Sequence, residues 1–407
     1  MQSLIALKST NFRLFFTGQS ISLLGTWIQK TAVAWVVYKI TGSPFVLGII
    51  GFVGLIPTLL LSPYVGSFVE HSHKYKVMKN TQFLAAIQAF LLALLFYFKV
   101  YNISIIILLT LMQGIINAFE VTCRQAMMID LVDDKEALPN AIALNSAMSN
   151  LARVVGPALA GILLSVFGDD FCFISNFVSF IPVIYCLYMM KLPLYESKPH
   201  LSNVWSELKE GFRYVKNEKT IFSQLLLLSF FSLMLIPFTT LLPVIAKEVF
   251  QGNSKTFTLF ESAVGIGSLL SAVYMTKLKQ MGKLHKIVIF SSCIMSAGLF
   301  TVSVSPGIHL AFWGLVLSGL GMISQSAAVN TYIQLNTDPK MRARVISYYI
   351  MAFIGMTPIG SLLIGCMAEF LSTRSVLFIE GVLGILAVTV FVIYSGKSKH
   401  ADVSTEL

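Results

Sequence analysis

Twelve stretches of apolar residues follow one another along the chain and are separated by short polar segments. Each stretch is long enough to cross about 30 Å of hydrocarbon as a helix. The pattern therefore predicts an all-α membrane protein with twelve transmembrane helices. Their approximate limits are 12–38, 44–69, 77–98, 103–128, 137–167, 171–191, 220–247, 256–277, 285–304, 308–333, 343–370 and 374–394.

The positions of lysine and arginine indicate how these helices are oriented. With the N-terminus in the cytoplasm, 22 of the 29 basic residues fall on the cytoplasmic side and 5 on the other side. Short cytoplasmic segments carry such an excess in membrane proteins. The sequence thus predicts that both termini are cytoplasmic.

Composition excludes several classes of protein. Charged residues make up 12% of the chain and hydrophobic residues 56%, whereas soluble domains have about 25% charged residues. The net charge of +10 does not indicate nucleic-acid binding, because the basic residues lie in short loops. The five scattered cysteines predict no disulfide and no metal site. The run Gly396-Lys397-Ser398 resembles the end of a P-loop, but position 391 is Phe, so we expect no ATP site, no cofactor and no enzymatic activity.

The second group of six apolar stretches repeats the pattern of the first. We therefore expect an N-terminal half at 1–191, a cytoplasmic linker at 192–219 and a C-terminal half at 220–407. Inside the linker, Val204, Leu208, Phe212 and Val215 share one side of a predicted helix. This amphipathic segment is typical of a helix that lies along a membrane interface.

Two consecutive stretches carry polar stripes. Gln113, Asn117, Glu120 and Arg124 follow a helical spacing in 103–128. The next stretch, 137–167, carries Arg153 on a polar face. Charges at membrane depth are costly, so they should face the bundle interior. We expect Glu120 and Arg153 to interact there.

The first stretch carries a similar stripe, formed by Gln19, Ser22, Thr26 and Lys30. The stripe favours a cavity lining for Lys30, although its side chain could also extend to the far interface. In the second half, Glu261 and Glu380 lie close to predicted helix ends. We expect both at the membrane interface, and we expect the deep charges to be concentrated in the first half.

Several short motifs, taken together, resemble the major facilitator superfamily. The likeness is greatest to the branch that contains the enterobactin exporter and secretion-effector efflux proteins, and it covers essentially the whole chain. The motifs lie at 11–15, 22–30, 41–44, 124–126, 140–146 and 153–161.

The resemblance implies a fold of two pseudo-symmetric six-helix halves that work by alternating access. It implies a substrate cavity lined by the first, fourth, seventh and tenth helices. In this chain the corresponding polar residues are Gln19, Thr26, Lys30, Gln113, Asn117, Gln325 and Asn330.

The resemblance also implies a monomeric secondary transporter of the bacterial inner membrane. We expect proton-coupled export of a small amphipathic or siderophore-like molecule. Glu120 is the expected protonatable group, and Arg153 and Lys30 are the expected cations of the polar core. Arg153 has two possible roles, as a structural tie to Glu120 or as a holder of an anionic substrate.

A further set of residues is expected to act in conformational change. The pair Gly156-Pro157 matches a signature of proton antiporters in the superfamily, although packing alone also explains a glycine and a proline there. The chain departs from the superfamily at Glu70 and His71, where Asp and Arg are usual. The full set comprises Gly66, Glu70, Arg124, Gly156, Pro157, Gly161 and Pro358.

Other functions remain compatible with the sequence. A lipid or lysolipid transporter could use the same fold, and so could an importer, because direction depends on coupling energetics. A membrane sensor or assembly partner that transports nothing is the third alternative. The sequence names neither the substrate nor the coupling ion.

Overall fold

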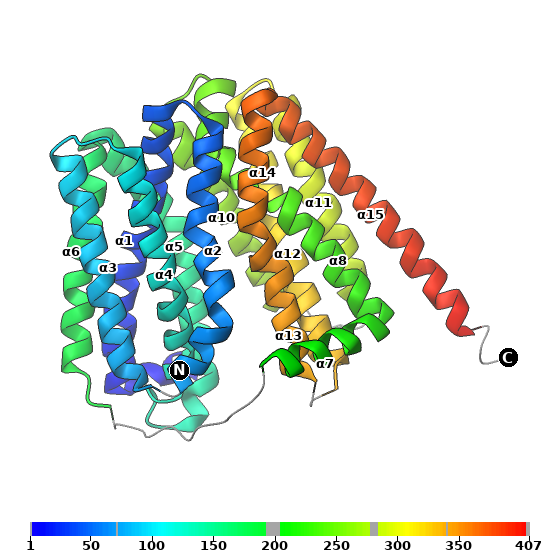
Figure 1. Ribbon diagram of the computed structural model, residues 1–407, viewed down its shortest axis with the longest axis horizontal. Coiled ribbons are helices and arrows are strands. Elements are labelled where there is room, and N and C mark those ends of the chain that lie inside the picture. Colours follow the sequence, from blue (N-terminus) through cyan, green and yellow to red (C-terminus); the bar gives the residue numbers. More distant parts are fainter. Residues whose placement is uncertain (1, 71, 193–203, 277–283, 339–340, 404–407) are drawn as a thin grey trace. The chain divides into compact units, whose positions relative to one another are not determined.

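The computed structural model describes residues 2–70, 72–192, 204–276, 284–338 and 341–403. Within these ranges every regular element is a helix and no strand occurs (Figure 1). The elements are η1 (Gln2–Lys8), α1 (Thr10–Thr41), α2 (Pro44–Glu70), α3 (Lys74–Tyr97), α4 (Ile103–Met127), η2 (Lys135–Ala137), α5 (Leu138–Val166), α6 (Asp169–Met189), α7 (Val204–Asn217), α8 (Lys219–Met234), η3 (Ile236–Leu241), α9 (Leu242–Val244), η4 (Ile245–Val249), α10 (Ser254–Thr276), α11 (Leu284–Val304), α12 (Ile308–Asn336), α13 (Arg342–Ile350), η6 (Met351–Gly355), α14 (Met356–Phe370) and α15 (Thr373–Val403).

Eleven helical segments of the described chain are long and apolar enough to cross a membrane. Helix α1 is the twelfth: it has 32 residues, but the polar stripe from Gln19 to Lys30 lowers its hydropathy. The predicted limits agree with the structure within three residues, except that α15 continues to Val403. The prediction of twelve transmembrane helices is therefore confirmed.

Two of the membrane segments are not continuous α-helices. The segment Lys219–Val249 passes from α8 through the 3₁₀ turn η3 and the short α9 into the π-helical turn η4. Pro237 and Pro243 lie in this part and lack the N–H that a regular helix needs. The segment Arg344–Phe370 contains a second π-helical turn, η6, between α13 and α14. The Ser232 hydroxyl donates to the Phe353 carbonyl of η6 at 2.9 Å, which ties the two irregular segments together.

The helices form two compact units. One comprises Met1–Gly42 and Val53–His200, and the other comprises Ser43–Phe52 and Leu201–Leu407. In the first unit α1 packs against α5 and α6, and α3 packs against α4 and α6. In the second unit α12 packs against α10 and α11, and α15 packs against α11. The first ten residues of the α2 region thus group with the C-terminal helices.

A seam of small residues joins α11 and α12. A Cβ atom added at Gly298 would lie 2.6 Å from the Gly314 carbonyl oxygen, and one added at Gly321 would lie 2.6 Å from the Met295 nitrogen. Both distances are shorter than any normal contact, so only glycine permits this approach of the two backbones. Further along the seam, Gln325 Nε2 donates to Ser292 Oγ at 2.8 Å.

The predicted amphipathic helix is present as α7. It runs across the ends of α8 and α13 in the second unit (Figure 1). Val215 on its apolar side is 3% exposed, and the Phe212 ring lies 6.1 Å from the Tyr348 ring between centroids. On the polar side Glu210 forms an ion pair with Arg344 at 2.6 Å. Helix α7 is therefore anchored on α13 by both apolar and charged contacts.

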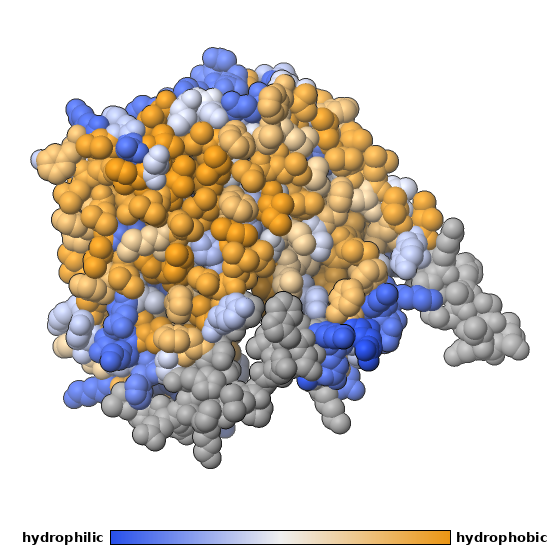
Figure 2. Space-filling model, viewed as in Figure 1, coloured by the Kyte–Doolittle hydropathy of each residue, from blue (hydrophilic) through white to orange (hydrophobic). Residues whose placement is uncertain are grey.

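The surface has the distribution of hydropathy that a membrane requires. Figure 2 shows that hydrophobic residues cover the middle of the helices on the visible face, while hydrophilic residues collect at the helix ends. Many large apolar side chains are exposed on the protein surface, among them Leu60, Tyr185 and Trp313. A soluble protein rarely exposes an apolar surface of this extent.

Candidate functional site

The first unit holds a buried carboxylate at the contact of three helices. Glu120 on α4 is 8% exposed. Its Oε1 accepts a hydrogen bond from Gln19 Nε2 of α1 at 2.9 Å and lies 3.3 Å from Arg124 Nε, one turn along α4. Arg124 also donates from Nη1 to Ser149 Oγ of α5 at 3.3 Å. Glu120 and Arg124 together link α1, α4 and α5.

The expected partner of this carboxylate was Arg153, and that prediction is wrong. Glu120 pairs with Arg124 instead, because the two residues stand four positions apart on one helix face. Arg153 forms no ion pair in the part of the chain that the structure describes. Its Nε atom is buried without a hydrogen-bond partner.

Arg153 lies instead over the indole of Trp27. The guanidinium carbon is 5.6 Å from the centroid of the ring, and the ammonium of Lys30 is 4.6 Å from the same ring. Such cation–π contacts are favourable, more so where water is excluded. Two of the predicted polar-core cations, Lys30 and Arg153, therefore contact the same aromatic side chain, Trp27.

Gly156 explains why this ring can sit between α1 and α5. A Cβ atom added at Gly156 would overlap the Cβ of Trp27 and would lie 3.4 Å from its Cγ. The glycine of the Gly156-Pro157 pair is thus required for the close approach of α5 to α1 at Trp27. We call the group formed by Trp27, Lys30, Arg153 and Gly156 the aromatic centre. Sequence reasoning singled out the glycine but not Trp27, which looks like any other aromatic residue in an apolar helix.

A second polar cluster in the same unit was not predicted. Asn176 Nδ2 of α6 donates to Gln29 Oε1 of α1 at 2.8 Å, and Gln29 Nε2 donates to Gln88 Oε1 of α3 at 3.2 Å. Gln88 in turn donates to the carbonyl of Leu109 on α4 at 3.1 Å. The only signal in the sequence was the presence of three amide side chains within apolar stretches. The chain of hydrogen bonds ties together four helices.

The remaining predicted cavity residues have varied surroundings. Thr26 donates to the Ser22 carbonyl of its own helix at 2.9 Å. Gln113 and Asn117 are half-buried. Gln325 is fully buried in the α11–α12 seam, where it serves helix packing. Asn330 is half-buried and its Oδ1 accepts from Gln334 one turn along α12 at 3.0 Å.

The residues that were predicted to act in conformational change also differ in their surroundings. Pro157, Gly161 and Pro358 are buried inside helices. Gly66 has open space around it, since a Cβ atom there would meet no atom within 4 Å. Glu70 is the last residue of α2, and its side chain and His71 lie outside the described part of the structure.

One carboxylate of the second unit contradicts the expectation of an interfacial position. Glu380 on α15 is 0% exposed, and both of its carboxylate oxygens are buried without a hydrogen-bond partner. It stands seven positions after Thr373, the first residue of the helix, and this nearness to a helix end suggested the interface. The start of α15 is itself covered, because Val376 and Leu377 are also 0% exposed.

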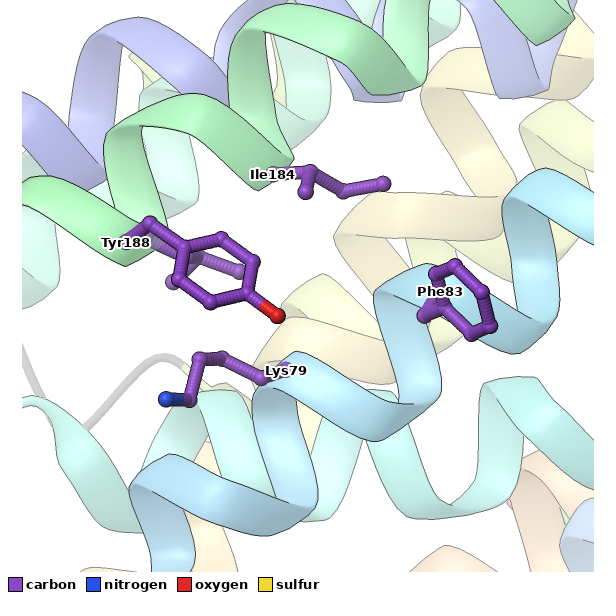
Figure 3. A pocket seen from close by; sticks show the side chains of 5 residues that line it. Lys79, Phe83, Ile184 and Tyr188 are labelled. Atoms are coloured by element: carbon purple, nitrogen blue, oxygen red, sulfur yellow. The ribbon is translucent and has the colours of Figure 1, made fainter.

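A shallow groove lies elsewhere, on the outer face of α3 and α6. Lys79 and Phe83 of α3 face Ile184 and Tyr188 of α6 across it (Figure 3). The ammonium of Lys79 lies 5.1 Å from the Tyr188 ring. None of the predicted site residues lines this groove, and Tyr188 is 71% exposed. In the described part of the chain, no group of three or more His, Cys, Asp or Glu residues could hold a metal ion.

Comparison with known proteins places this geometry in context. A family model described as transmembrane secretion effector matches residues 1–405. A staphyloferrin A transporter of Staphylococcus aureus (strain NCTC 8325 / PS 47) is 31% identical over 400 residues, which cover 95% of this chain and 96% of the relative. Macrolide efflux protein A of Streptococcus pyogenes is 21% identical over 384 residues, which cover 92% of this chain and 95% of the relative.

Solved structures share the fold. The nucleoside transporter NupG superposes with a TM-score of 0.71 at 15% identity, over 95% of this chain and 98% of that one. A bacterial homologue of the iron transporter ferroportin superposes with a TM-score of 0.69 at 16% identity, again over 95% and 98%. At these identities the likeness concerns the arrangement of helices alone.

Proposed function

Because the chain belongs to the transmembrane secretion effector family of major facilitator transporters, we propose that it exports a small amphipathic, siderophore-like anion in exchange for protons. Membership of the family confirms the resemblance in the motifs and makes the chain a multi-pass membrane transporter of small molecules. Direction, substrate and coupling ion are our proposal. The proposed mechanism is alternating access of the two halves around a site near the membrane midplane.

The observation that carries the substrate class is the surroundings of Arg153. Its guanidinium lies over Trp27 at 5.6 Å from the ring centroid and forms no ion pair in the described chain. A buried or half-buried cation without a carboxylate partner attracts an anion, and guanidinium binds carboxylates through two parallel hydrogen bonds. The indole supplies an apolar face for the remainder of the ligand. The relative named for staphyloferrin A supports the same substrate class.

A macrolide-like drug is the second candidate, because macrolide efflux proteins are also relatives. A guanidinium gives such a ligand no charge complementarity unless it carries an anionic group. The two candidates therefore differ in whether binding depends on the positive charge at Arg153.

Proton coupling is proposed for the Glu120–Arg124 pair. Protonation of Glu120 removes its charge and with it the Coulomb attraction to Arg124 across 3.3 Å. Arg124 then keeps only its hydrogen bond to Ser149 of α5. The hydrogen bond from Gln19 of α1 to Glu120 of α4 loses its charged acceptor, so the link between these two helices weakens. In this scheme Arg124, rather than Arg153, senses the proton, and Arg153 is left for the substrate.

The remaining parts of the proposal concern the membrane location, the orientation and the oligomeric state of the transporter. The 22 to 5 distribution of basic residues supports an orientation with both termini in the cytoplasm. Membership of the family supports a location in the bacterial inner membrane. We also propose that the transporter works as a monomer, with the lipid bilayer and the substrate as its partners.

The test uses purified protein in proteoliposomes with an imposed pH gradient. We expect substrate-dependent proton movement with a siderophore anion, which Glu120→Gln abolishes and which Glu136→Gln, at an exposed site on η2, leaves intact. Arg153→Gln should weaken substrate binding at least tenfold without changing proton binding. The double variant Glu120→Gln/Arg124→Gln controls for the unpaired charge that the single variant leaves buried.

Each outcome of this experiment has a clear meaning. If Glu120→Gln retains proton-driven transport, the proposed coupling site is wrong. If lysolipids are moved and siderophore anions are not, the lipid-transporter alternative holds. Uptake rather than release under the physiological gradient would establish an importer, and the absence of any flux would favour a sensor or assembly role.

A further inference from the structure

Helix α15 buries a carboxyl group in the middle of its apolar face. Val376, Glu380, Gly384 and Val388 follow one another at intervals of four residues, so they share one side of the helix. All four are buried, and Glu380 is 0% exposed. Neither carboxylate oxygen has a hydrogen-bond partner. The side chain is thus surrounded by protein on a face that is otherwise apolar or glycine.

Two glycines beside Glu380 bring neighbouring helices close to it. A Cβ atom added at Gly381 would lie 3.1 Å from Phe300 Cβ of α11. One added at Gly384 would lie 2.6 Å from Leu235 Cδ2 next to α8 and 3.1 Å from Ser296 Cβ of α11. At these two contacts the neighbouring residues pack directly against the backbone of α15, within about one turn of Glu380.

Hydroxyl groups on α11 do not satisfy the carboxyl group. Ser296 donates to the Ser292 carbonyl at 2.9 Å, and Ser303 donates to the Phe300 carbonyl at 2.7 Å. Both hydroxyls are therefore bonded to their own helix. The half-buried thiol of Cys293 on α11 forms no hydrogen bond to Glu380 either.

No charged group of the surrounding elements serves as a partner. Helix α15 packs on α8, α11, α14 and η4. Besides the thiols of Cys293 and Cys366, the ionisable residues that these elements contribute are the following: Lys219, Lys247, Glu248, His285, Lys286 and Glu369. The lysines and glutamates among them are exposed, and none of these residues forms an ion pair with Glu380.

The two remaining candidates are engaged elsewhere. His285 stacks on Phe391 with ring centroids 5.1 Å apart, and Phe391 lies eleven residues beyond Glu380, about 16 Å along the helix axis. Arg374 on α15 donates from Nη1 to the Ser303 carbonyl at 3.0 Å and lies over the Phe250 ring. Among the residues that the structure describes, the carboxyl group of Glu380 therefore has no cation to balance a negative charge.

An ionised carboxylate without a partner is far too costly in such surroundings, and the group takes up a proton instead. We propose that Glu380 is a second proton-binding site, located in the C-terminal unit and occupied by a proton in this conformation. This inference goes beyond the proposed function, which places proton binding at Glu120 in the first unit. Occupancy of the site does not depend on which substrate the transporter moves.

Infrared difference spectroscopy on the full-length protein in lipid nanodiscs tests the proposal. A protonated carboxyl group has a C=O stretch well separated from that of a carboxylate. At neutral pH we expect such a band in the wild type and its loss in Glu380→Gln, which replaces the neutral acid by a neutral group of nearly equal size. Glu369→Gln is the matched control, because the Glu369 carboxylate is exposed and accepts a hydrogen bond from Ser43 Oγ at 2.8 Å. It should leave the band unchanged.

Stability gives an independent readout that requires neither transport nor substrate. If folding binds a proton at Glu380 that the unfolded chain has released, stability falls as pH rises above the ordinary carboxyl range near pH 4–5. The unfolding equilibrium constant should then rise by up to about tenfold per pH unit more in the wild type than in Glu380→Gln or Glu380→Leu.

Two results would overturn the inference. One is a protonated-carboxyl spectrum at neutral pH that Glu380→Gln does not alter. The other is an identical pH dependence of unfolding in the wild type and in both Glu380 variants. Because both experiments are done without substrate, a failure of the proposed export function would leave their outcome unaffected.

Discussion

A methyl group at Gly156 is the smallest change that tests the aromatic centre. In the Gly156→Ala variant the new Cβ would overlap Trp27 Cβ, by more than about 1 Å relative to the 3.5 Å separation of carbons in contact. Rotation of the Trp27 ring about its side-chain bonds leaves the Cβ atom in place, so the clash is relieved only if the helices α1 and α5 separate. Overpacking of this kind costs about 1–3 kcal/mol, which exceeds the gain of about 1 kcal/mol that alanine brings to a helix in place of glycine.

The matched control is Gly66→Ala on α2, where the added Cβ meets no atom within 4 Å. It should show the same helix-propensity gain without the overpacking, so the two variants should differ by the overpacking cost alone, about 1–3 kcal/mol in unfolding free energy. The assay is SDS-induced unfolding of the purified protein in mixed micelles. Displacement of Trp27 should also weaken the binding of a siderophore anion in Gly156→Ala. Equal stability of the two alanine variants would refute the close contact of α5 with Trp27.

Three further outcomes follow from the contacts of the first unit. Glu120→Gln should destabilise the protein by about 3–5 kcal/mol, because it leaves the Arg124 charge buried without its partner, and adding Arg124→Gln should recover most of that loss in the same unfolding assay. Asn176→Leu should cost about 1–3 kcal/mol, because Gln29 Oε1 loses its donor at 2.8 Å; a fully neutral effect on the unfolding midpoint would contradict the buried network. Lys39→Gln should change stability by less than about 1 kcal/mol, and less still at high salt, because the Lys39 side chain is 55% exposed in its ion pair.

The membrane helices were predictable because bilayer thickness sets the length of each apolar stretch and loop charge sets its orientation. Both features can be read from the sequence without knowledge of tertiary contacts. Even α1, whose polar stripe lowers its hydropathy, was predicted as one of the twelve apolar stretches. The amphipathic helix α7 was equally visible, since Val215 and Phe212 recur at helical spacing. In these cases the structure of a single helix depends on its own residues and on the surrounding lipid or water.

The partners of the polar side chains were less predictable, because they depend on which helix faces which. Glu120 could reach Arg124 on its own helix or Arg153 on another, and the spacing alone allowed both. In the structure Glu120 pairs with Arg124, and Arg153 lies over the ring of Trp27. The role of Trp27 becomes visible only in the structure, where Gly156 lies against it. Glu380 was misplaced for a related reason. Its nearness to a helix end suggested solvent, but the neighbours that cover that end come from distant parts of the sequence.

The glycine seam between α11 and α12 has a practical consequence for following the transport cycle. Backbones that touch at Gly298 and Gly321 cannot slide or separate without losing many contacts at once. A pair of spectroscopic probes, one on each of these helices, should therefore report a constant separation under every condition. That separation serves as an internal reference distance. A change in the distance between probes at other positions can then be assigned to movement of the protein rather than to the probes. The backbone amides of the seam should also be among the last in the second unit to exchange with deuterium.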